Sequence, residues 1–404
     1  MLDKIGILCY ATKSKGTGGR IKSEPEDFVV EEVWDDGVVE AKNFRGKEMP
    51  KGELTGTGDY IWFTLEKKDW DSFKAIRYLA DFCNVSRKRF SYAGTKDKFA
   101  VTAQRLCAWK IDLQKLYRFG AGGLWVYDAF LSEKRMELGD HSGNRFTIRI
   151  RDIERDTVSE FLTEAEKGIP NFYGIQRFGA RLNSHSVGKQ ILKGNLEEAV
   201  RIYLAESTPS EGEKSREARI WLSENWGEFK AALDKFPINS RPERTLLSHL
   251  SIHPNDYANA LRRLPKGLFK MFVHAYQSYL FNLVLSERVK LGVGTKLDGD
   301  DAPLTCPVYG YDCKLLGGQA GEIEKKALEQ EGLALEDFRI KSIPEASGKG
   351  IRREAMLSFK NFNVISSGKD RVAEFEIPAG SYATVLLEEL MKVGATQKKE
   401  TQSD

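Results

Sequence analysis

Between Asn84 and Lys110 the sequence places one carboxylate, Asp97, among several cations, a pattern suited to nucleophilic chemistry on a polyanion. Asp97 lies on the glycine-containing turn 94–98, and nearby positive charge favours the ionised form of a carboxyl group. An ionised carboxylate can act as a nucleophile in covalent catalysis. The cations around it are Arg87, Lys88, Arg89, Lys96, Lys98 and Arg105.

Aromatic residues are interleaved with these cations: Phe90, Tyr92, Phe99 and Trp109. Nucleobases stack on aromatic faces, and phosphates are attracted to the cations beside them. The segment therefore indicates chemistry on a nucleic acid. Charged residues on a glycine-containing turn are also common in solvated loops, so the segment by itself leaves that structural interpretation open.

A second segment, residues 171–179, carries groups that could recognise a base. Asn171 has an amide that can read a base edge, and Phe172 and Tyr173 have flat faces. Arg177 adds hydrogen-bond donors next to flexible glycines. A turn with a satisfied asparagine and core aromatics is the competing interpretation of this segment.

Local charge matters more in this chain than total charge. The 404 residues carry a net charge of +3, so nucleic-acid binding would have to come from local patches. One such patch is a glycine-containing loop with Lys349, Arg352 and Arg353. These side chains could contact phosphate or remain solvated.

The composition is that of a soluble globular enzyme, with 30% charged and 41% hydrophobic residues. No apolar run reaches membrane-spanning length and the first residues lack a signal-peptide pattern, so we expect a cytoplasmic protein without membrane contact. The five cysteines are odd in number and widely spaced, with no C-x-x-C pair. We expect free thiols and no metal site.

Alternating apolar residues predict the elements that must position Asp97. We expect a strand that begins after Pro25 and includes Phe28, followed by a second strand over residues 59–67. A helix capped by Asp69 would then lead into the loop that carries Asp97. After this loop the chain should re-enter the sheet.

A later strand, residues 145–151, has an apolar face and a cationic face. Phe146, Ile148 and Ile150 point one way, and the arginines point the other way. These are Arg145, Arg149 and Arg151. A charged outward face is usually solvated, yet three arginines on one side of a sheet also suit phosphate contact, and both interpretations stay open.

Helical periodicity in the middle of the chain contrasts with the strand-rich ends. We predict one catalytic sheet domain, formed by residues 1–185 and 342–404, that is interrupted by an inserted helix-rich domain at 186–341. A cleft between the two domains would suit a large ligand. Residues 396–404 should form a disordered tail.

Six segments follow one another in a specific order. They are KSEPEDFVVEE, AGTKDKFAVTAQ, LGDHSGNRFTIRIRD, NFYGIQRFG, AYQSYLFN and IPAGSYATVLLEE. In this order they resemble the signature segments of the tRNA pseudouridine synthase D (TruD) family. The resemblance extends from residue 22 to residue 389, which is nearly the whole chain.

The resemblance implies an α+β fold, in which the mixed β-sheet core and flanking helices of pseudouridine synthases carry an inserted helix-rich α/β TRUD domain that forms one wall of an RNA cleft. The implied activity is that of an isomerase, which breaks the bond between ribose C1′ and uracil N1, turns the base and rejoins it through C5. The implied substrate is uridine 13 of tRNA. No metal or redox cofactor, membrane or obligate protein partner is implied.

The resemblance also implies residue roles. Asp97 corresponds to the catalytic aspartate, and Phe28, Asn171 and Tyr382 correspond to residues that contact the target uridine. Lys22 corresponds to the basic residue near the catalytic acid. From the charge pattern we expect the RNA backbone to be contacted by Arg87, Lys88, Arg89, Lys96, Lys98, Arg177, Lys349 and Arg352.

Two positions depart from the family's pattern. Phe172-Tyr173-Gly174 stands where the family often has Tyr-Phe-Gly, and Tyr382 stands where Phe can occur. An aromatic face is kept at both positions, while the roles of the two tyrosine hydroxyls stay open. The choice between attack of Asp97 at C1′ and attack at C6 also stays open.

Two other functions compete with this hypothesis. A catalytically inactive RNA-binding or tRNA-folding module would bind tRNA with a steep salt dependence and form no product. A metal-dependent nuclease is disfavoured because Asp97 has no companion acid in its loop. Acid pairs elsewhere, such as Glu31 and Glu32, alternate between the two faces of a strand. The leading hypothesis is therefore a stand-alone tRNA pseudouridine synthase.

Overall fold

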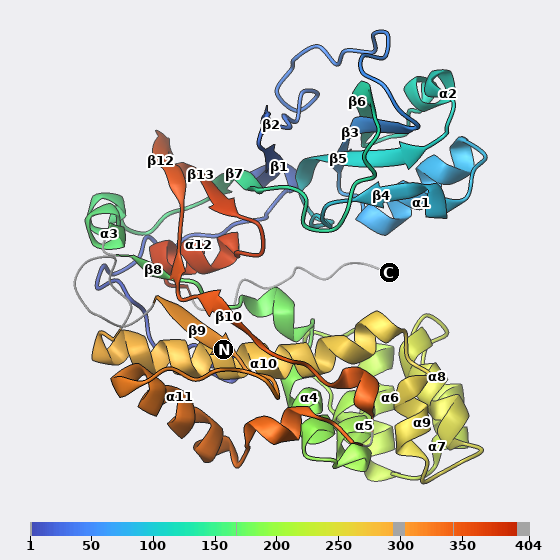
Figure 1. Cartoon of the computed structure of the whole chain (residues 1–404), viewed down its shortest axis with the longest axis vertical. Coiled ribbons are helices and arrows are strands. Elements are labelled where there is room, and N and C mark those ends of the chain that lie inside the picture. The colour runs from blue at the N-terminus through green and yellow to red at the C-terminus, as the bar shows by residue number, and fades with distance from the viewer. Residues whose placement is uncertain (1, 167, 294–303, 342, 394–404) are drawn as a thin grey trace.

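Apolar runs near both ends of the chain form a mixed sheet, and the periodic middle of the chain forms a helical part beside it (Figure 1). The computed structural model describes residues 2–166, 168–293, 304–341 and 343–393, and in these residues the main sheet has nine strands. This architecture confirms the predicted α+β class, with a mixed sheet and flanking helices.

Strands from both ends of the chain share the sheet. The main path runs β12-β13-β7-β1-β5-β3-β6, with β2 paired to β1 and β4 paired to β5. Neighbouring strands are antiparallel except β1 and β5, which are parallel. The strands are β1 (Phe28–Trp34), β2 (Gly37–Val38), β3 (Tyr60–Lys68), β4 (Phe90–Tyr92), β5 (Val101–Trp109), β6 (Leu124–Ser132), β7 (Gly143–Ile150), β12 (Lys360–Ser367) and β13 (Asp370–Pro378).

Helices pack on each half of the sheet and bury its apolar side chains. α1 and α2 share one buried cluster with β3, β5 and β6, whereas α3 and α12 share another with β1, β7 and β13. These helices are α1 (Ser72–Phe82), α2 (Leu113–Arg118), α3 (Val158–Ala165) and α12 (Ala383–Met391). The prediction that Asp69 caps α1 is wrong, because the side chain of Asp71 accepts the capping hydrogen bond from the backbone N–H of Lys74.

The helical part is organised around α10, which is 26 residues long and is buried on several faces. α4 lies close to α10 because Gly188 has no Cβ, which would collide with the carbonyl oxygen of Phe272. The helices are α4 (Ser184–Leu192), α5 (Leu196–Ala205), α6 (Glu213–Glu224), α7 (Phe229–Lys235), α8 (Arg241–Leu250), α9 (Tyr257–Arg262), α10 (Lys266–Leu291) and α11 (Gly318–Glu331). In the described part of the chain, no helix has the length and apolarity needed to cross a bilayer.

Two short antiparallel ladders lie where the chain passes between the sheet and the helices. β8 (Ile169–Pro170) pairs with β11 (Met356–Leu357), and β9 (Thr305–Val308) pairs with β10 (Ile351–Glu354). The domain boundaries at 185/186 and 341/342 stay a prediction, as does the disordered tail, which lies outside the described residues.

Asn282 of α10 connects the N-terminal segment with the chain that follows β8. Its Nδ2 donates to the carbonyl oxygens of Ile5 and Tyr173, at 2.8 Å and 3.0 Å, and its Oδ1 accepts from the backbone N–H of Tyr173 at 2.9 Å. Asn282 is fully buried, so these backbone groups have no access to water there. One amide therefore holds two distant segments on α10.

Replacing Asn282 with Ala should lower the free energy of unfolding by about 2 kcal/mol, because buried backbone groups lose their partners. Urea unfolding followed by circular dichroism measures this change. Asn239→Ala, at an exposed asparagine, serves as the control and should leave stability within about 0.5 kcal/mol of the original. Equal stability of the Asn282 variant would contradict the connecting role.

Candidate active site

The parallel pairing of β1 and β5 brings two predicted site segments to one edge of the sheet. Val29 of β1 is paired with Val101 of β5, so the residues that precede each strand lie next to each other. The turn that contains Lys22 precedes β1, and the loop that contains Asp97 precedes β5. β3 runs antiparallel to β5, and its C-terminal end, with Lys67, reaches the same edge.

Lys22 and Asp97 form an ion pair at this edge. Lys22 Nζ lies 2.5 Å from Asp97 Oδ2, and the two side chains are 27% and 40% exposed, so the carboxylate is open to a ligand. The described residues donate no hydrogen bond to the other oxygen, Oδ1. The sequence-based expectation of a basic residue beside Asp97 therefore agrees with the geometry.

The backbone of Lys22 is held in an unusual conformation. Its φ is +56°, in the left-handed region that residues with a Cβ seldom occupy. The buried carboxylate of Asp27 accepts from the backbone N–H groups of Ser23 and Glu24, each at 3.0 Å. Arg151 in turn forms a bidentate pair with Asp27, at 2.8 Å. These contacts fix the turn that directs Lys22 at Asp97.

Three side chains, those of Lys67, Ser72 and Gln104, form hydrogen bonds with the main chain of the Asp97 loop. Lys67 Nζ donates to the carbonyl oxygen of Asp97 at 2.5 Å, and Ser72 Oγ bonds both backbone groups of Lys96, at 3.1 Å and 3.2 Å. Gln104 Nε2 donates to the carbonyl oxygen of Gly94 at 3.0 Å. Lys67 is fully buried, and this burial lowers the pKa of its ammonium to about 8, although the charge of Asp97 opposes the change.

Lys96 is buried beneath the loop rather than directed at solvent. Its side chain is 5% exposed, and its Nζ lies 2.8 Å from Oε1 of the fully buried Glu32. The other oxygen of Glu32 accepts from the backbone of Arg105 and from Trp34 Nε1. This burial contradicts the prediction that Lys96 contacts the RNA backbone, because a buried, paired ammonium is not accessible to phosphate.

Asn171 lies directly after β8 and is held by the strand that follows the helical part. Its Nδ2 donates to the carbonyl oxygen of Glu354 at 3.1 Å, and its Oδ1 accepts from Arg353 Nη2 at 2.8 Å. Its backbone N–H donates to the carbonyl oxygen of Ala355 at 2.7 Å. Asn171 is 6% exposed, and these two side-chain contacts use one of the two N–H groups and one of the two oxygen lone pairs of its amide.

Tyr382 lies at the start of α12, against the segment that contains Asn171. Its ring centroid is 6.0 Å from that of Tyr173, with a dihedral angle of 64° between the rings. Burial raises the pKa of the Tyr382 phenol, although the nearby charges of Arg177 and Arg353 oppose the change. The hydroxyl is therefore protonated at neutral pH and can donate a hydrogen bond.

Phe28 contacts Lys22 and shares a buried cluster with residues next to Asp97 and Tyr382. Its ring centroid is 4.0 Å from Lys22 Nζ, which is a cation–π distance. The same buried cluster contains Ala100, which follows the Asp97 loop, and Ala383, which follows Tyr382. Phe28 itself is 2% exposed, so in this structure its ring supports Lys22 from within the core.

Most of the other cations predicted to contact RNA are accessible. Four are exposed: Arg87, Lys88, Lys98 and Lys349. Arg89 is half-buried and donates to the carbonyl oxygen of Lys110 at 2.8 Å, and the half-buried Arg177 donates to Ser278 Oγ at 3.1 Å. Both retain further N–H donors.

Arg352 and the three arginines of residues 145–151 form ion pairs within the protein. Arg352 lies 2.7 Å from the fully buried Glu324 and donates to backbone oxygens of the helical part, which contradicts its predicted contact with RNA. The arginines at 145, 149 and 151 pair with Glu31, Asp370 and Asp27 respectively. Arg145 and Arg151 are about three-quarters buried in their ion pairs, whereas Arg149 is 42% exposed and stays partly solvated.

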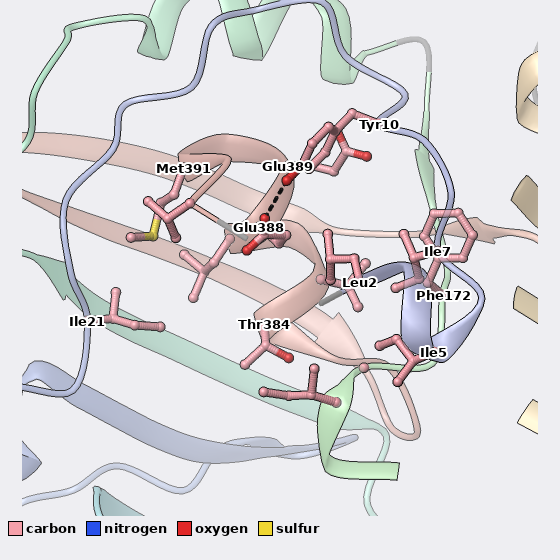
Figure 2. A pocket seen from close by; sticks show the side chains of 15 residues that line it. Leu2, Ile5, Ile7, Tyr10, Ile21, Phe172, Thr384, Glu388, Glu389 and Met391 are labelled. Atoms are coloured by element: carbon pink, nitrogen blue, oxygen red, sulfur yellow. Dashed lines mark hydrogen bonds between the residues drawn. The ribbon is translucent and has the colours of Figure 1, made fainter. Parts of the chain in front are cut away.

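An apolar cavity of about 110 Å³ lies behind the Asn171 segment and is too small for a nucleotide, since ligand pockets usually exceed about 300 Å³. Figure 2 shows Ile5, Phe172 and Thr384 around it, together with the hydrogen bond from Tyr10 to Glu388. We interpret this cavity as a packing defect between the N-terminal segment and α12. In the described residues, no three His, Cys, Asp or Glu side chains form a cluster that could hold a metal ion.

Sequence reasoning missed two residues that organise the site. Lys67 is the last residue of the strand predicted at 59–67 and the penultimate residue of β3, and no local pattern shows that its ammonium contacts the Asp97 loop. Arg353 belongs to a basic loop and was expected to be solvated or to contact phosphate, whereas it contacts Asn171. In both cases the partner is far away along the chain.

Comparisons with known proteins identify the family. The family model described as tRNA pseudouridine synthase D (TruD) matches residues 4–302 and 293–390. A Methanosarcina acetivorans protein named probable tRNA pseudouridine synthase D is 36% identical, with 98% of this chain and 97% of that protein covered. A Methanopyrus kandleri protein of the same name is 41% identical, with 86% and 92% covered.

The fold has a close match among solved structures. A crystal structure of a tRNA pseudouridine synthase D homologue from Methanosarcina mazei superposes with a TM-score of 0.77 at 34% identity, and each chain is covered to 97%. The order of motifs, the mixed sheet and the near-complete coverage lead to one assignment. The chain belongs to the tRNA pseudouridine synthase D (TruD) family and is a pseudouridine synthase, which is an isomerase.

Proposed function

We propose that this protein converts uridine 13 of tRNA into pseudouridine and that Asp97 is its catalytic carboxylate. The observation that carries this proposal is the ion pair between Lys22 and Asp97 at the sheet edge, where Asp97 Oδ1 is left without a partner among the described residues. A partly exposed carboxylate with one oxygen that accepts no hydrogen bond from the described residues suits nucleophilic attack.

The reaction is an isomerisation and needs no co-reactant. The bond from ribose C1′ to uracil N1 breaks, the base turns, and a bond from C1′ to C5 forms while the C5 proton is lost and N1 gains a proton. Asp97 could act by attack at C1′, which stabilises an oxocarbenium-like state, or by attack at C6 of the base. Both routes use the same carboxylate, and the choice between them stays open.

The remaining site residues would hold a uridine that has left its stack. Aromatic faces offset the few kcal/mol that unstacking costs, and Phe28 and Tyr382 supply such faces. Asn171 would read the base edge. Because Phe28 is covered in this structure, entry of the base would require its side chain or Lys22 to shift.

The accessible cations would hold the tRNA backbone through phosphate contacts. On the sheet side they are Arg87, Lys88, Arg89 and Lys98, and on the helical side they are Arg177 and Lys349. Their positions on separate parts of the chain suit a large, folded RNA. A cytoplasmic location, where tRNA is available, is part of the same proposal.

Asp97→Asn should abolish pseudouridine formation while leaving the Kd for tRNA within about threefold, because the phosphate contacts remain. Tritium release from 5-labelled uridine in tRNA measures turnover, and filter binding measures affinity. A fully active variant would rule out Asp97 as the catalytic group. If the unmodified protein bound tRNA without releasing tritium, it would be an inactive RNA-binding module.

The target position can be tested with two tRNAs that differ only at position 13. We expect pseudouridine in the tRNA with uridine 13 and none at any position in the tRNA with cytidine 13. Mapping of pseudouridine along the RNA provides the readout. Formation at another uridine would leave the isomerase activity in place and refute the assignment of position 13.

Lys67→Met should lower kcat about a hundredfold with little change in KM, because the Asp97 loop loses its anchor and the carboxylate moves from its productive position. Steady-state tritium release at pH 7 measures both constants. Lys47→Met, which removes an exposed lysine paired with Glu40, is the matched control and should leave kcat unchanged. An unchanged kcat in the Lys67 variant would refute the anchoring role.

A further inference from the structure

The side-chain amide of Asn171 is hydrogen-bonded on both sides. Arg353 Nη2 donates to Asn171 Oδ1 at 2.8 Å, and the Nδ2 group on the other side of the same amide donates to the carbonyl oxygen of Glu354 at 3.1 Å. A guanidinium can only donate hydrogen bonds, and a carbonyl oxygen can only accept them.

The orientation of the Asn171 amide is therefore determined by its neighbours. If the amide were rotated by half a turn, its NH₂ would face the N–H groups of Arg353 and its oxygen would face the carbonyl oxygen of Glu354. Both contacts would then be repulsive. Because charge-assisted hydrogen bonds are among the stronger ones in proteins, Arg353 is the main restraint on this rotation.

Arg353 is itself held in place. Its Nη1 donates to the carbonyl oxygen of Gly380 at 3.1 Å, and its Cζ lies 4.4 Å from the centroid of the Tyr173 ring. Within the part of the chain that the structure describes, no carboxylate pairs with it. The cation is therefore directed at Asn171 and at the loop before Tyr382, rather than at an acid that would neutralise it.

A fixed amide distinguishes uracil from cytosine. The contacts with Glu354 and Arg353 use one N–H and one oxygen lone pair of Asn171, so one N–H and one lone pair of its amide remain. Uracil presents a donor at N3 and an acceptor at O4, whereas cytosine presents an acceptor at N3 and a donor at N4. For a base in one position, the first pattern fits one orientation of the amide and the second pattern fits only the rotated amide.

We propose that Arg353 is a specificity-determining positioning residue, which locks the Asn171 amide in the orientation that accepts uracil and rejects cytosine. This inference rests on the proposed function, because it takes Asn171 as the residue that reads the target base. It adds a reason for the choice of base that Asn171 alone does not supply, since a free asparagine can rotate to suit either base.

The experiment compares two tRNAs that differ only in uridine or cytidine at the target position. Both are bound by the full chain with Asp97→Asn, so that no turnover occurs, and the ratio of the two Kd values is measured. We expect this protein to favour uridine by about tenfold. Adding Arg353→Met should reduce the ratio to about one, whereas Arg353→Lys, which keeps a charged donor, should retain most of it.

Two controls separate this role from a general effect on structure. Arg339, whose Cζ lies 4.3 Å from the ring centroid of Tyr311, is also an arginine stacked on a tyrosine, and Arg339→Met should leave the ratio unchanged. In an Asn171→Ala background, Arg353→Met should have no further effect on the ratio. If Arg353→Met fails to fold, Arg353→Gln takes its place with the same expectation, because its amide can donate or accept.

The outcomes distinguish the inference from the function on which it rests. An undiminished ratio in a folded Arg353→Met or Arg353→Gln variant would overturn the inference and leave the proposed function intact, provided that the protein with Asp97 forms pseudouridine. A protein with Asp97 that forms no pseudouridine in tRNA would overturn the proposed function and the inference together.

Discussion

The ion pair between Lys22 and Asp97 is the interaction on which this edge of the sheet depends, and two other lysines near the same loop have different partners. Lys22 pairs with the carboxylate, Lys67 holds the carbonyl oxygen of the same residue, and Lys96 is withdrawn into a buried pair with Glu32. Of the three, only Lys22 contacts the carboxylate of Asp97. In the loop around Asp97, most charged residues are basic in sequence, yet the partly exposed Asp97 carboxylate has one ionic partner among the described residues, Lys22.

Other cations of the sheet are also paired with buried acids. Glu31 is fully buried between Arg45 and Arg145. Burial would raise its pKa, but hydrogen bonds from Arg45 and from the backbone of Ala41, with the charge of Arg145, bring it below its usual value. Removal of one partner from such a buried pair leaves an uncompensated charge, so these arginines are bound to the fold. Among the described residues, the cations proposed for RNA contact that have no acidic partner, such as Lys88 and Lys98, are the more exposed ones.

The proposed uridine pocket is assembled from segments that are distant in sequence. Asn171 precedes the helical part, Arg353 follows it, and Tyr382 lies near the C-terminal end of the described chain. Asn282, in the longest helix, fixes the backbone of Tyr173 and thereby the segment of Asn171. The helical part thus contributes to the geometry of the proposed pocket.

The family, the α+β class and a strand that begins after Pro25 and includes Phe28 follow from the sequence alone, because they depend on local periodicity and on an ordered set of motifs. The resemblance of those motifs also implied a basic residue near Asp97, and Lys22 lies there. Tertiary structure alone decided which cations are available. Lys96 and Arg352 have the same local composition as the exposed cations beside them, yet they pair with buried acids that are distant in the chain. A charge pattern shows that a side chain is cationic, whereas its role depends on the acid that folding places within about 4 Å of it.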